Sequence, residues 1–91
     1  MNKTLNVPIQ LISVTSTVGE LTPVLFKLEN EQHEIVTIRI DRIITCKERG
    51  YQSSKELIFT CTAPLADGAQ HLFNLKYNVL LHKWTLFELL S

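Results

Sequence analysis

The chain has 91 residues, enough for a single small domain over 1–91 and too few for two. Nine Lys and Arg residues balance nine Asp and Glu residues, which argues against a strongly cationic nucleic-acid or membrane-surface binder. Hydrophobic residues make up 45% of the chain and charged residues 20%, and these values argue against a disordered protein.

The cellular compartment is indicated by what the sequence contains and omits. No apolar segment follows Met1, and no run approaches the 18 apolar residues of a membrane span. Cys46 and Cys61 are the only cysteines, too few for the disulfide framework of a small secreted domain. We therefore expect a reduced, cytoplasmic protein with no membrane partner.

Composition and alternation favour strands from the start of the chain. Val, Ile and Thr supply 23 of the 91 residues, a β-biased composition. Residues 5–15 alternate apolar and polar side chains, which predicts a half-buried strand. Up to Leu11 the apolar residues occupy odd-numbered positions, whereas Ile12 and Val14 occupy even-numbered ones. This change of phase predicts a bulge or bend. Pro8 lacks an N–H and predicts an edge position.

A predicted turn over 16–22 leads to a second strand. Residues 23–29 alternate again, with one apolar face made by Val24, Phe26 and Leu28. The polar segment 29–34 predicts an exposed hairpin loop.

The third predicted strand, 35–46, shows the strongest alternation, with Val36, Ile38 and Ile40 on one face. The alternation slips at Asp41-Arg42, since Ile43 and Ile44 cannot both continue that face. We expect a bulge or a barrel corner there, followed by a polar loop over 47–55.

Two further strands are predicted over 56–63 and 70–77, joined by a tight turn at Asp67-Gly68. Their expected inner faces are Leu57, Phe59, Cys61 and Ala63 on the first, and His71, Phe73, Leu75 and Tyr77 on the second.

The last segment, 83–90, fits two structures. It can be a strand with Trp84 and Leu86 inward, or part of a helix that continues from Asn78. We favour the strand, because a six-stranded meander needs this segment to pair. We expect Phe73, Tyr77 and Trp84 to be core residues.

Together the segments predict an all-β protein: a small six-stranded antiparallel meander curled into an open SH3-like barrel. Several strands are apolar on parts of both faces, and curling the sheet buries more of this surface and removes edges.

The order of several short motifs resembles that of a family of small uncharacterised all-β proteins of Gram-positive bacteria. The resemblance covers roughly residues 7–88 and is carried by Gly19, Thr22-Pro23, Ile40-Asp41-Arg42-Ile43, Thr60-Cys61, Leu75-Lys76-Tyr77 and Trp84. The chain departs from the family at Phe59, where a Tyr often stands, and its connections over 29–34, 64–70 and 78–83 are longer. The resemblance implies a bacterial host and, because the family is often encoded near a translesion DNA polymerase, a DNA-damage setting. It implies no particular activity.

Asp41-Arg42 is the most distinctive polar pair. It can mark a functional site at a strained bulge. It can also be structural, with Asp41 accepting backbone N–H groups and Arg42 bracing a neighbouring strand. We favour the structural interpretation.

A modest basic segment surrounds this pair and supplies our candidate binding residues: Arg39, Asp41, Arg42, Lys47, Arg49 and Tyr51. Small barrels offer stacking platforms beside basic grooves, so this segment is a candidate contact for single-stranded nucleic acid. The alternative is a solvated strand end.

Chemistry at a metal or a nucleophile is poorly supported. Zinc ligands usually come in closely spaced pairs, whereas Cys46, Cys61, His71 and His82 are 15, 10 and 11 residues apart. The apolar neighbours of Cys61 would deactivate its thiol, and no nucleophile elbow, phosphate loop or zinc-protease motif is present. We expect no metal, no cofactor and no enzymatic activity.

Leu80 and Leu81 would crowd the tip of a turn over 78–82, whereas in a helix they would simply pack. We expect either this tip or an edge strand to form a homodimer contact. The function that we predict is a non-catalytic binding or adaptor module with a protein or nucleic-acid partner. The alternatives are a self-associating structural protein and a weak contact with single-stranded nucleic acid through residues 39–51.

Overall fold

The computed structural model describes residues 3–51, 54–65 and 67–91. These residues form one antiparallel sheet in the order β3-β2-β1-β7-β6-β5-β4. Its strands are β1 (Lys3–Thr15), β2 (Leu21–Glu29), β3 (Ile35–Arg39), β4 (Arg42–Arg49), β5 (Glu56–Pro64), β6 (Gln70–Asn78) and β7 (Lys83–Leu89).

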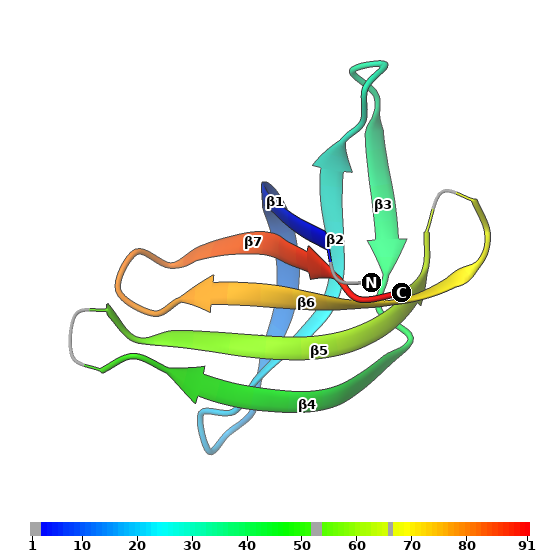
Figure 1. Ribbon diagram of the computed structural model, residues 1–91. Helices are drawn as coiled ribbons and strands as arrows, with labels where there is room; N and C mark the ends of the chain where they lie inside the picture. Colours follow the sequence, from blue (N-terminus) through cyan, green and yellow to red (C-terminus); the bar gives the residue numbers. More distant parts are fainter. Residues whose placement is uncertain (1–2, 52–53, 66) are drawn as a thin grey trace.

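The long first strand divides the sheet into two halves. Residues 3–9 of β1 pair with β7, whereas residues 10–15 pair with β2. The β2–β3 hairpin therefore runs across the direction of strands β4–β7, and β1 belongs to both halves (Figure 1). Our expectation that Pro8 lies in an edge strand is wrong, because β1 is internal. Pro8 nevertheless precedes the β2 pairing, so only β7 flanks it.

The irregularity predicted near Leu11 is confirmed, but its extra residue lies on the partner strand. Ile12 pairs with Leu25 and Ser13 pairs with Pro23, so Val24 is bulged out of the ladder. Ile12 and Val14 stay on the exposed face of β1 rather than turning inward.

The slip predicted at Asp41 is a barrel corner that divides the expected third strand into β3 and β4. Backbone hydrogen bonds explain the break: the Ile40 N–H donates to the Val24 carbonyl at 3.0 Å, and the Asp41 N–H donates to the Thr62 carbonyl at 2.8 Å. Adjacent residues thus bond to opposite halves of the sheet. The described residues therefore form seven strands rather than six, and the loop predicted from Lys47 starts only after Arg49, where β4 ends.

The C-terminal segment is a strand, as we favoured, and it pairs with both β1 and β6. A turn over 79–82 precedes it. Asn78 holds this turn, because its backbone carbonyl accepts the His82 N–H and its side-chain Oδ1 accepts the Leu81 N–H, each at 2.9 Å.

The core lies where the two halves face each other. Phe26 of β2 meets Phe73 of β6 edge to face, with ring centroids 5.6 Å apart, and both rings are fully buried. Around them lie the other buried residues: Ile38, Phe59, Cys61, Ala63, Leu75 and Leu86. The inner faces predicted for 56–63 and 70–77 supply most of this core.

The all-β fold and the curled, open sheet are confirmed. The barrel is open because β3 and β4 end the strand order without pairing to each other. In the described part of the chain, no helix is long and apolar enough to cross a membrane.

Candidate functional sheet edge

Strand β4 is the most accessible strand of the described sheet. It ends the strand order, and all eight of its residues are exposed. By contrast, the other edge strand, β3, has only five residues, of which Ile38 is buried. The backbone N–H and C=O groups of β4 that point away from β5 therefore have no strand partner among the described residues.

The pairing with β5 divides the β4 side chains between two faces. Directly opposite residues of paired strands share a face. Ile43, Cys46 and Glu48 pair with Cys61, Phe59 and Leu57, so they lie on the inner, core-facing side. Arg42, Lys47 and Arg49 pair with Thr62, Ile58 and Glu56 and form a basic row on the outer side.

The structure brings together only part of the predicted binding set. Arg42, Lys47 and Arg49 follow one another along β4, and the exposed Tyr51 lies just past its end. Arg39 lies on β3, where it pairs with Leu25 at the opposite edge of the sheet.

The roles predicted for the corner pair are wrong. Asp41 accepts a hydrogen bond from the Gln70 side-chain amide at 2.9 Å rather than from backbone N–H groups. Arg42 forms no ion pair with any described residue, and backbone bonds of Ile40 and Asp41 hold the corner.

Arg49 differs from Arg42 and Lys47, because its guanidinium group has an ion-pair partner and an aromatic contact. Its Nη2 lies 2.9 Å from Glu56 Oε1, and Lys76 Nζ lies 3.6 Å from the other carboxylate oxygen. Both cations also lie over the ring of Phe87, at 5.3 and 4.5 Å from its centroid. Arg42 and Lys47, in contrast, have no ion-pair partner within the described ranges.

A groove of about 380 Å³ runs along the inner side of β4. The β1–β2 turn forms its opposite wall, and Leu21, Leu57 and Phe59 supply apolar lining. Glu20 adds a negative charge to the groove, whereas the Oε1 of Glu48 lies 3.2 Å from Lys55 Nζ in an ion pair. Sequence analysis missed the groove, because it forms only when the β1–β2 turn folds over the β4–β5 face.

Cys46 also lines the groove, but its thiol is not activated. Partial burial and, second, the negative charge of Glu48 raise the pKa of Cys46. Burial and, second, Cys46 raise the pKa of Cys61 to about 12. A thiol with a raised pKa is a poor nucleophile at neutral pH.

The basic row shares its face of the sheet with Phe87, whose ring Arg49 and Lys76 cover, whereas Phe59, Tyr77 and Trp84 lie on the inner face. Trp84 stacks between Tyr77 and Phe59 on the inner side, with ring centroids 4.7 and 5.6 Å from them. Of the three aromatic residues predicted to be core, Phe73 is buried in it, Trp84 is half-buried and packs against it, and Tyr77 is half-buried outside it. Near the basic row, two cations cover Phe87, and Tyr51 is the exposed aromatic residue among those described.

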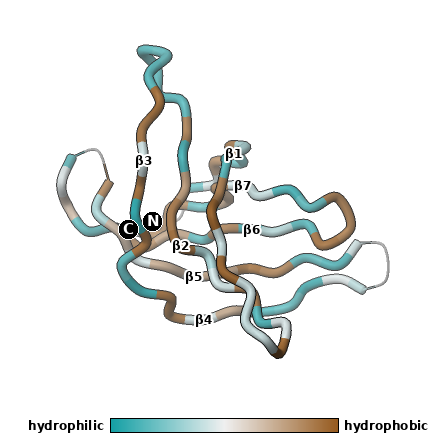
Figure 2. The backbone as a smooth tube through the Cα atoms, turned by 180° about the vertical axis from the view of Figure 1, so that it is seen from behind, coloured by the Kyte–Doolittle hydropathy of each residue, from teal (hydrophilic) through white to brown (hydrophobic). Residues whose placement is uncertain are grey.

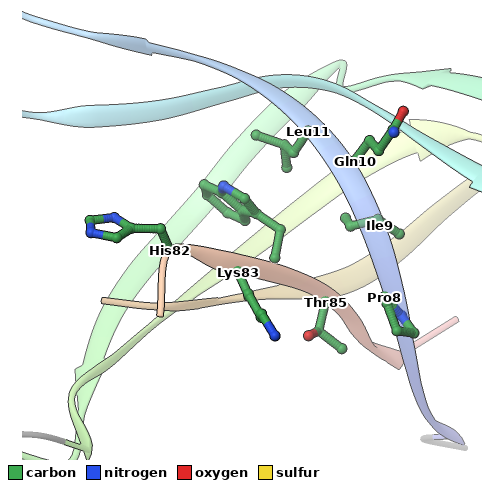
Figure 3. Close-up of a pocket in the computed structure, with 8 residues that line it drawn as sticks. Pro8, Ile9, Gln10, Leu11, His82, Lys83 and Thr85 are labelled. Atoms are coloured by element: carbon green, nitrogen blue, oxygen red, sulfur yellow. The ribbon is translucent and has the colours of Figure 1, made fainter. Parts of the chain in front are cut away.

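A recess of about 580 Å³ opens where β1 leaves β7 (Figure 3). Trp84, Lys83 and Thr85 line it from β7, facing residues 8–11 of β1. His82 at its rim is engaged, with Nδ1 2.8 Å from the Tyr77 hydroxyl. The recess is a shallow groove between diverging strands.

His71, another of the considered metal ligands, is held by two acceptors. Its Nε2 lies 2.9 Å from Asp67 Oδ2, and its Nδ1 lies 2.7 Å from the Ser91 backbone oxygen. Over the described ranges, no group of three or more His, Cys, Asp or Glu residues is arranged to hold a metal ion.

The predicted contact residues Leu80 and Leu81 do project from a turn, with 60% and 57% of their surface exposed. The Val79 N–H donates to the Lys55 carbonyl at 3.1 Å, so this turn lies beside the β4–β5 connection. Figure 2 shows the turn as an apolar segment at one end of the sheet.

Two motifs that carry the family resemblance meet at the barrel corner. Thr22-Pro23 and the segment 40–43 line one shallow recess around the bulged Val24. Comparisons with protein-family models, curated proteins and solved structures found no match to this chain. The family assignment therefore stays a prediction.

Proposed function

We propose that this protein is a non-catalytic binding module that engages an extended segment of a protein partner along strand β4. The observation that supports the proposal is the complete exposure of an eight-residue edge strand. Native proteins usually shorten or cover such edges, since unpaired backbone groups invite an added strand. Peptide recognition by strand addition uses the same groups.

Apolar side chains on β4 favour a protein partner. Ile43 is 36% exposed, although its partner Cys61 on β5 is buried, and Ile44, which a register shift leaves without a partner on β5, is 49% exposed. An added strand would cover both residues. A nucleic-acid partner would use the basic row, but Arg49 and Lys76 already cover the Phe87 ring on that face, which leaves Tyr51 as the exposed aromatic residue near it among the described residues.

A matched pair of variants tests the proposal. Ile44→Lys places a charge in the β4 edge, and Ile35→Lys makes the same change on the exposed β3 edge. Tagged wild-type and variant proteins are used to capture partners from the native host, with and without nuclease.

The proposal expects a protein partner that resists nuclease, that Ile44→Lys loses and that Ile35→Lys retains. Equal capture by both variants would reject β4 as the binding strand. Material that nuclease removes would favour the nucleic-acid contact instead.

Self-association is a second candidate, because Leu80 and Leu81 are both exposed on a turn that hydrogen bonds hold in place. Sedimentation over a range of concentrations tests it. A dimer that is lost in the double variant Leu80→Ser, Leu81→Ser would support this contact, and a monomer at high concentration would remove it.

A further inference from the structure

The two sides of the β4 edge differ in charge, and this difference constrains what can pair with it. The outer side presents Arg42, Lys47 and Arg49, of which only Arg49 has an ion-pair partner among the described residues. The inner side presents Glu48, and Glu20 lies across the groove from β4.

A second copy of β4 is poorly suited to this edge. In an antiparallel pair, directly opposite side chains share a face, and like charges opposite each other are destabilising. Self-pairing would bring two outer basic rows together. Glu48, the only acidic residue of β4, lies on the inner face, so it cannot pair directly opposite the basic residues of a second copy.

The inner side selects against acidic side chains. A residue of an added strand that points inward would enter the groove lined by Leu21, Leu57 and Phe59. These side chains favour an apolar residue, and Glu20 would repel a carboxylate. Glu48 would contribute less to this repulsion, because its Oε1 lies 3.2 Å from Lys55 Nζ. Successive residues of a strand point to opposite faces. The preference for acidic side chains on the outer face and for apolar side chains on the inner face therefore falls on alternate positions of the added strand.

We propose that the β4 edge binds an extended peptide segment in which acidic residues alternate with apolar residues. The acidic side chains would lie beside Arg42 and Lys47 on the outer face. The apolar side chains would lie on the inner face beside Ile43 and Cys46, at the β4 wall of the groove. This inference rests on the proposed function and specifies the chemistry of its partner.

Synthetic peptides test the alternation directly. The probe is a capped eight-residue peptide of alternating Glu and Val, which matches the length of β4. Two control peptides replace Glu by Lys or by Thr. Binding to the full chain is followed at low ionic strength by NMR chemical shifts, which also report where each peptide binds.

We expect the Glu–Val peptide to bind about tenfold more tightly than the Lys–Val peptide, because two or more charge pairs change sign. The shifts should map to residues 42–49 and 57–59, and added salt should weaken binding. Lys47→Glu should reverse the preference between the two peptides. Arg39→Glu makes the same charge change on β3 and should alter affinity less than twofold.

Several results would overturn the inference. These are equal or tighter binding of the Lys–Val peptide, an equal effect of Arg39→Glu, shifts confined to 79–82, and tighter binding of a single-stranded oligonucleotide at β4. If the Thr–Val peptide binds β4 as tightly as the Glu–Val peptide, the acidic preference fails while β4 remains the binding strand. If no peptide shifts β4 resonances, both the inference and the proposed function are rejected.

Discussion

The contact between Phe26 and Phe73 should hold the two halves of the sheet together, and it can be tested by substitution. Each ring is fully buried. An aromatic side chain buries about 150–250 Å², worth about 4–6 kcal/mol at roughly 25 cal/mol per Å² as an upper estimate. Measured Phe→Ala costs in cores are about 3–5 kcal/mol. Such a loss is large beside the roughly 5–14 kcal/mol total stability that is usual for a domain of this length.

Leu substitutions keep most of the volume and are the better perturbation. Phe26→Leu and Phe73→Leu should each lower the free energy of unfolding by about 1–2 kcal/mol in urea titrations. The double variant should reveal a coupling of about 0.5–1.5 kcal/mol, the value of an edge-to-face pair. Val18→Ala, at a position 80% exposed, should change stability by less than about 0.5 kcal/mol. Additive losses in the double variant would refute a direct link between the halves.

Two further predictions concern a charged pair and a loop. Hydrogen bonds to the Ser91 oxygen and to Asp67 raise the pKa of His71, and the bond from His71 lowers the pKa of Asp67. The stabilisation by His71 is complete below its unfolded pKa of about 6.5 and is lost as pH rises through the folded value. The stabilisation by Asp67 is complete above its unfolded pKa of about 3.9 and is lost as pH falls through its lower folded pKa. The pair therefore stabilises the protein most between the unfolded pKa values of Asp67 and His71. An NMR titration should show a lower pKa for His71 in Asp67→Asn, and an unchanged pKa would exclude the pair as the cause. Gly50→Ala should destabilise the protein more than Gly19→Ala, because both have positive φ but only at Gly50 would a Cβ lie 2.5 Å from a backbone oxygen. Equal midpoints in thermal melts would contradict this.

Much of the fold could be predicted because alternation is a local property. Phe59, Cys61 and Phe73 fall on the inner faces that period-two patterning assigns to them. The slip at Asp41 also marked the corner correctly. The pattern could not show that the corner ends one strand and starts another, because that break depends on backbone bonds to Val24 and Thr62.

The candidate site was less predictable, because it depends on contacts between distant segments. The sequence placed Arg39 and Arg42 in one basic segment, but the corner between them sends them to opposite sheet edges. The groove beside β4 needs Leu21 to approach Phe59, 38 positions along the chain, and no local pattern encodes that approach.

Amide hydrogen exchange along β4 tests the central claim most directly. An unpaired edge leaves backbone N–H groups that point away from β5 open to solvent, so protected and unprotected amides should alternate over residues 45–49, beyond the register shift at Ile44, in the free protein. Saturating Glu–Val peptide should protect the exposed set while leaving β3 amides unchanged. Uniform protection of β4 without peptide, or no gain when peptide is bound, would contradict the assignment of β4 as the binding edge.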